Sequence, residues 1–142
     1  MQLAHLQYDR PRLKKICQQL DLRLVVLFCS RATGKPPPGP DSDVDLAVLG
    51  MTEQKLWDCY TALAPAFPSY TLDLSSLRSA DPLFRHEIMI GGILLHGDPE
   101  LFYDYRAYAY RDFIDSADLR RVEVTLFKKK MAYLAEQLDG SS

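Results

Sequence analysis

The stretch LRLVVLFCSRATGKPPPGPDSDVDLAVL, from Leu22 to Leu49, decides the fold of this chain. Its first part, from Leu22 to Cys29, is almost continuously apolar, as expected of a short strand that is covered on both faces. The loop from Ser30 to Ser42 is rich in proline, which removes backbone donors, so no regular element is predicted there. A second strand is predicted from Asp43 to Leu49.

Two carboxylates at the start of the second predicted strand share one face. Side chains alternate along a strand, so Asp43 and Asp45 point one way while Val44 points the other. The two carboxylates are then about 7 Å apart along the strand. A third predicted strand over 70–74 adds Asp73 on a neighbouring strand. Carboxylates hold Mg²⁺ together with substrate phosphates, so the pattern predicts a magnesium site that binds a nucleotide triphosphate.

This set of residues suits nucleotidyl transfer. Two Mg²⁺ ions can clamp the attacking and leaving oxygens of an in-line displacement, while three carboxylates hold the ions and one assists deprotonation. Ser30 and nearby backbone N–H groups can bind the phosphates. The plainer interpretation is a solvated strand end, because an isolated Asp-x-Asp is common by chance. Ser30 before Asp43 and Asp45, with Asp73 on a later strand, favours the functional interpretation.

The rest of the chain alternates helices with short strands. Apolar spacing and helix caps predict helices over 9–20, 52–64, 81–90, 98–114 and 116–139, and a strand over 93–95. Thr52 is the expected cap of the second of these helices. The predicted fold is a single α/β domain over 1–142, with a small mixed sheet flanked by helices in a catalytic core (1–97) and a helical C-terminal extension (98–139). Aromatic rings occur around more than one face of the helix near 101–113, which indicates a partner surface.

Composition narrows the functional classes. The net charge of −2 and the sequence pI of about 5.9 give no electrostatic footprint for nucleic-acid binding. The three cysteines, Cys17, Cys29 and Cys59, have apolar neighbours and no CxxC spacing, so we expect reduced, mostly buried thiols and a cytoplasmic protein. No signal peptide and no membrane span is expected, since no segment approaches 18 consecutive apolar residues.

The order of these motifs resembles a known family. An apolar strand, Ser30, a loop and SDVDLAV at 42–48 resemble the Gly-Ser…Asp-x-Asp signature of the DNA polymerase β-like nucleotidyltransferases, specifically the minimal nucleotidyltransferases. Asp73 stands in the place of their third carboxylate. The segments FRHEI at 84–88, GILL at 92–95 and DPELF at 98–102 resemble the MntA-like antitoxins. Cys29 departs from the family's glycine, and the spacer before Asp43 is longer than usual and stiffened by prolines.

The resemblance implies a polymerase β-like palm and an antitoxin adenylyltransferase. Such an enzyme moves AMP from ATP to a tyrosine hydroxyl of a cognate HEPN ribonuclease toxin, neutralises it, and forms a hetero-oligomer with it. Asp43, Asp45 and Asp73 are the expected catalytic and Mg²⁺-binding residues, and Cys29, Ser30 and Arg31 the expected nucleotide-binding ones. Two alternatives stay open: a non-catalytic antitoxin that acts by binding alone, and a nucleotidyltransferase for a small molecule or an RNA 3′ end.

Overall fold

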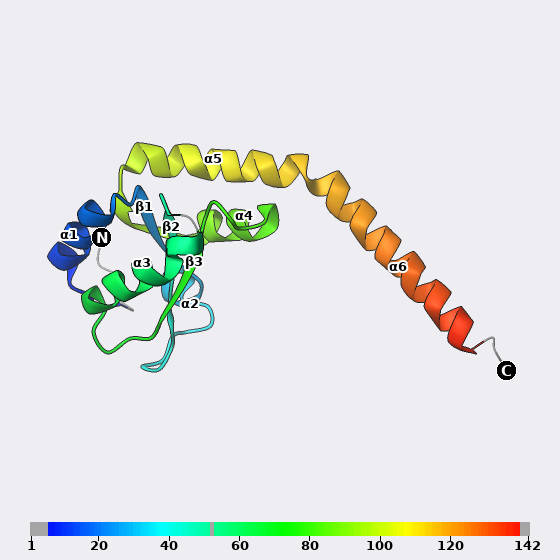
Figure 1. Ribbon diagram of the computed structural model, residues 1–142, viewed down its shortest axis with the longest axis horizontal. Helices are drawn as coiled ribbons and strands as arrows, with labels where there is room; N and C mark the ends of the chain where they lie inside the picture. Colours follow the sequence, from blue (N-terminus) through cyan, green and yellow to red (C-terminus); the bar gives the residue numbers. More distant parts are fainter. Residues whose placement is uncertain (1–5, 52, 140–142) are drawn as a thin grey trace.

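A four-stranded mixed sheet forms the centre of the molecule, seen here in a computed structural model that describes residues 6–51 and 53–139 (Figure 1). The strand order is β3-β2-β1-β4. β1 is antiparallel to both of its neighbours, whereas β2 and β3 are parallel. The strands are β1 (Leu24–Phe28), β2 (Val44–Leu49), β3 (Leu72–Ser76) and β4 (Ile93–Gly97). The predicted mixed sheet is therefore confirmed.

Helices cover both faces of this sheet. Three of them begin in the same way: Asp9, Asp81 and Asp98 each accept a hydrogen bond from a backbone N–H of the first turn, and a proline stands in that turn. Thr52, the expected cap of another helix, lies outside the described residues. The helices are α1 (Arg10–Leu20), α2 (Ser30–Thr33), α3 (Leu56–Leu63), α4 (Pro82–Gly91), α5 (Pro99–Asp115) and α6 (Ala117–Asp139), with short 3₁₀ turns η1 (Glu53–Lys55) and η2 (Ala64–Ala66).

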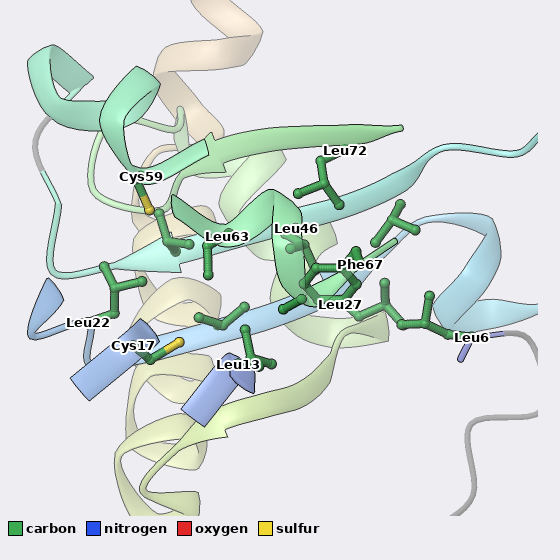
Figure 2. Packing of buried hydrophobic residues seen from close by; sticks show 14 residues of the cluster. Leu6, Leu13, Cys17, Leu22, Leu27, Leu46, Cys59, Leu63, Phe67 and Leu72 are labelled. Carbon is green, nitrogen blue, oxygen red and sulfur yellow. The ribbon is translucent and has the colours of Figure 1, made fainter. Parts of the chain in front are cut away.

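The apolar core has two layers, one on each side of the sheet. Side chains of α1, α3 and η2 pack on the first face, where Leu13, Leu63 and Phe67 meet Leu27 and Leu46 (Figure 2). The second layer places Ile88 and Met89 of α4 and Phe102 and Ala109 of α5 against the other face. All five residues of the central strand β1 are buried, as predicted from its continuous apolar sequence.

Two local predictions were wrong. Ser30–Thr33 forms the helical turn α2, although we expected no regular element after β1. The backbone N–H groups of Ala32 and Thr33 donate to the Cys29 carbonyl, and these bonds complete the turn before the first proline is reached. The second correction concerns Asp43, which lies just ahead of β2, because that strand begins at Val44.

α4 and α5 are joined to each other and to the sheet by one buried arginine. Arg85 donates to the carbonyl oxygen of Leu77 over 2.9 Å and forms a 2.9 Å ion pair with Asp112 of α5. From the end of α5, α6 extends away from the rest of the molecule (Figure 1), and none of its residues is buried. Across the described residues, no helix has the length and apolar character needed to span a membrane.

Candidate active site

The candidate site is built on the parallel pairing of β2 with β3. Asp45 and Asp73 are register partners in this pair, so their side chains leave the same face of the sheet from adjacent strands. Asp43 lies two residues before Asp45 and follows the same alternation. The intervening residues, Val44 and Leu46, are fully buried in the core on the opposite face. The core thus fixes the direction of Asp45 and Asp73, and Asp43 lies close enough for its charge to raise the pKa of Asp45.

The carboxylates repel one another in the absence of a cation. Partial burial raises the pKa of Asp45 above its ordinary value, and the charges of Asp73 and Asp43 raise it further. A side-chain hydrogen bond from Cys29 acts in the opposite direction. This excess of negative charge is what a bound divalent cation neutralises. Within 6–51 and 53–139, no three His, Cys, Asp or Glu side chains lie close enough together to hold a metal ion.

Cys29 lies at the turn between β1 and α2, next to this acidic cluster. Its backbone φ is +62°, a value that glycine adopts readily and that other residues rarely adopt. The chain therefore keeps a glycine-like turn with a side chain added to it. The Cys29 thiol hydrogen-bonds to Asp45, and its pKa is raised by burial and by the charges of Asp45 and Asp73. A protonated thiol at neutral pH is the result.

The expectation of mostly buried thiols holds for two of the three cysteines. Cys17 and Cys59 are buried in the core, whereas Cys29 is exposed, and all three are free thiols. Cys29 is exposed because it follows the last residue of the buried strand β1 and lies in the turn before α2. Its apolar neighbours in the sequence, all inside β1, gave the wrong indication.

Arg31, the second residue of α2, fastens the proline-rich loop. Its side chain is almost fully buried, and its guanidinium donates to the Ser42 carbonyl from Nε at 3.1 Å and from Nη2 at 2.7 Å. Nη2 also donates to the Gly39 carbonyl over 3.1 Å, and the group lies 4.7 Å from the centre of the Tyr70 ring. These contacts hold the residue directly before Asp43. Direct contact of Arg31, Ser30 or Cys29 with a nucleotide stays a prediction.

A hollow of about 330 Å³ opens beside β3. Its walls include Asp73 and Leu72 of the strand and Leu56, Trp57 and Tyr60 of α3. The Trp57 and Tyr60 rings are stacked, with centroids 5.5 Å apart and an interplanar angle of 10°. Trp57 is 73% exposed, which is unusual for so large an apolar side chain. Sequence analysis missed this feature; Trp57 lies off the apolar stripe of its helix, and that position was the available signal.

Carboxylates on two adjacent parallel strands, facing a small-residue turn after the neighbouring antiparallel strand, define a nucleotidyltransferase palm. The sequence agrees with this class. Residues 12–100 match the family model described as polymerase beta, nucleotidyltransferase, so the chain belongs to the polymerase β nucleotidyltransferase family. No curated protein matches the sequence.

Several solved structures share the fold. One, described as a toxin-antitoxin with AMP-PNP, has a TM-score of 0.67 and 22% identity, over 84% of this chain and 98% of that one. Another, described as the tri-AMPylated Shewanella oneidensis HEPN toxin in complex with MNT antitoxin, has a TM-score of 0.62 and 20% identity, over 84% and 96%. A third, the toxin-antitoxin MntA-HepT, gives a TM-score of 0.62 and 20% identity, over 84% and 97%. The expected palm fold is confirmed.

Proposed function

We propose that this nucleotidyltransferase moves AMP from ATP to a tyrosine hydroxyl of a cognate HEPN toxin in the cytoplasm and thereby neutralises the toxin. The observation that carries the proposal is the register pairing of Asp45 with Asp73, with Asp43 on the same side. The fold is shared with structures whose descriptions mention AMP-PNP and a tri-AMPylated HEPN toxin, which supports this choice of nucleotide and acceptor.

The carboxylate set fits Mg²⁺. Its oxygen donors are the ligands that hard cations prefer, and the charges of Asp73 and Asp43 add to burial in raising the pKa of Asp45. Asp43 and Asp45 would hold the metal, and Asp73 would complete the site. When bound, Mg²⁺ supplies charge neutralisation for the triphosphate and for the leaving pyrophosphate.

The proposed transfer is a single displacement at the α-phosphorus of ATP. The phenolic oxygen of the acceptor forms a bond to this phosphorus, and the bond from the phosphorus to the oxygen that bridges to the β-phosphate breaks. Pyrophosphate leaves with the electron pair of that bond. The phenolic proton passes to the Asp73 carboxylate and then to water. Asp73 suits this role because it is more exposed to solvent than Asp45 and lies on the edge strand β3.

The hollow beside the edge strand β3 offers a contact surface for the acceptor protein. Its stacked Trp57 and Tyr60 rings offer flat apolar surface, and Asp73 lies in the same wall. The Asp73 carboxylate leaves the opposite face of the sheet, because Leu72 and Leu74 on either side of it pack toward α3. We therefore propose that Trp57 and Tyr60 contact the acceptor protein beside its reacting tyrosine.

Intact-mass measurement tests the function. The HEPN protein encoded beside this gene is incubated with the chain, ATP and Mg²⁺, and we expect a mass gain of one or more AMP units. Asp45→Asn and Asp73→Asn should each remove the gain, while Asp41→Asn, an exposed carboxylate change in the preceding loop, should leave it intact. Full transfer by both site variants would exclude the mechanism. A stable complex without any mass gain would instead support an antitoxin that acts by binding alone.

A further inference from the structure

α6 presents an apolar surface that the domain itself does not use. Large apolar side chains occur along its whole length at 40% to 78% exposure, and none of the 23 residues of the helix is buried. One row of these residues has the alternating spacing of three and four that marks a helix-pairing seam. This row, named the arm stripe, consists of Val124, Phe127, Met131, Leu134 and Leu138. Such a surface in water indicates a docking site.

The helix is held in a defined direction at its base. Arg120, in the first turn of α6, donates to the Phe113 carbonyl of α5 over 2.9 Å and to the Ser116 hydroxyl. Its guanidinium also lies 4.2 Å from the centre of the Phe113 ring. These contacts join the end of α5 to the start of α6, and Figure 1 shows the result, an arm that projects beyond the nucleotidyltransferase domain. The arm stripe is therefore presented to a partner at a fixed angle.

Charge selects the kind of partner. Lys128 and Lys130 flank the middle of the arm stripe at the two positions that contact a paired helix. If two copies of this chain paired in parallel along the full stripe, their lysine triplets 128–130 would lie at the same level. In an antiparallel pair the triplets would lie about one helical turn apart, and in both arrangements they would repel each other. A helix with acidic residues beside its apolar seam would instead form attractive pairs there. A membrane surface is less suitable, because α6 carries five basic and four acidic side chains and no basic face.

We propose that the arm stripe docks an amphipathic, acid-flanked helix of the HEPN partner protein. The identity of this partner rests on the proposed function, but the docking surface does not depend on catalysis. The arrangement separates two tasks: α6 holds the partner, and the carboxylate site modifies it. Such a division gives the enzyme selectivity for one protein, since transfer then follows capture.

Paired variants test the proposal on the full-length chain. Phe127→Asp with Leu134→Asp places two charges in the arm stripe; Thr125→Asp with Ala132→Asp places two charges at the same spacing on the opposite side of α6. We expect the stripe pair to weaken binding to the HEPN partner by about tenfold or more, measured by calorimetry, and the control pair to bind like the wild type. Lys128→Glu with Lys130→Glu should also weaken binding, whereas Lys129→Glu, which points away from the seam, should not.

Any of three results would overturn the proposal, two of them in partner binding and one in self-association. The first is unchanged partner binding by the stripe pair, and the second is no binding by the wild type. The third is a wild-type chain that is dimeric alone and becomes monomeric in the stripe pair, which would assign α6 to self-association. AMP transfer is measured separately on the same samples. If the stripe pair loses partner binding and the wild type binds the partner without transferring AMP, the docking surface is retained and the proposed function is rejected.

Discussion

The guanidinium of Arg31 holds the carbonyl of Ser42 through two hydrogen bonds, of 2.7 Å and 3.1 Å. Ser42 immediately precedes Asp43, so a residue of the turn after β1 fixes the start of β2 across the proline-rich loop. Arg31 is thus a positioning residue for the carboxylates, whatever contact it makes with a nucleotide. A loop of this length without such a clasp would leave Asp43 in many orientations.

Replacing Arg31 tests whether its hydrogen bonds to the loop position the carboxylates. Arg31→Ala removes both guanidinium hydrogen bonds to the partly buried Ser42 carbonyl and one of the two donors to the Gly39 carbonyl, and we expect a loss of about 2 kcal/mol in the free energy of unfolding. AMP transfer should fall mainly through a raised KM for ATP, because Asp43 loses its fixed position. Arg31→Lys should recover part of the stability, since an ammonium reaches one carbonyl but cannot span both. Lys35→Ala, an exposed change in the same loop, is the control, and an Arg31→Ala enzyme with wild-type KM would exclude the positioning role.

Replacing Cys29 tests how much the glycine-like turn lowers the free energy of unfolding. Because its φ is +62°, Cys29→Gly should relieve backbone strain and stabilise the fold by about 1 kcal/mol, as measured by urea unfolding. Cys29→Val should destabilise the fold, since a β-branched residue tolerates this conformation poorly. Transfer by Cys29→Gly should match or exceed that of the wild type. A loss of transfer in this variant would show that the thiol itself takes part in the site.

The buried thiols predict a loss of stability in alkaline solution. Burial raises the pKa of Cys17 to about 12, with a smaller contribution from Cys59, and burial raises that of Cys59 to about 11. In the unfolded chain both ionise near 9, so the stabilisation they give is complete below pH 9 and is lost as pH rises through 11 to 12. Cys17→Ala should reduce this slope in urea unfolding between pH 9 and pH 11. An unchanged slope would mean that other groups cause the alkaline loss.

Thiol labelling gives an independent check on the same cysteines. At pH 8 the native protein should react at one thiol, Cys29, and in urea at three. Cys29→Gly removes the native reaction and serves as the control. Rapid labelling of two or more thiols in the native state would contradict the packing of α1 against α3.

Replacing Trp57 tests whether the hollow beside β3 contacts the acceptor protein. Trp57→Ala removes one of the two stacked rings, so we expect an increase of about tenfold in the KM for the HEPN acceptor and little change in the KM for ATP. Trp57→Phe should restore most of the acceptor affinity. Steady-state kinetics with each substrate varied in turn distinguishes these outcomes. An effect confined to the KM for ATP would assign the hollow to the adenine base instead.

Local sequence rules determined most of the secondary structure. A short continuous apolar run that ends at a proline-rich loop favours a strand covered on both faces. Asp followed by Pro starts a helix at Asp81 and at Asp98 because the Asp side chain accepts a hydrogen bond from an otherwise unpaired backbone N–H. Alternation along β2 and β3 put Asp45 and Asp73 on polar faces before their pairing was known. The residues alone predicted that these carboxylates share a magnesium site, and the resemblance to the polymerase β family supported that prediction.

Only the tertiary structure decided which of these residues meet. The parallel register that sets Asp45 beside Asp73 depends on how β2 and β3 pack beneath α3, and no local pattern specifies that register. The burial of Arg31 and the exposure of Cys29 likewise result from long-range packing, since Arg31 lies in a polar segment and Cys29 follows an apolar run. Periodicity predicted the helix α6 but not its projection into solvent, because a helical stripe shows that a face will be covered and leaves open what covers it.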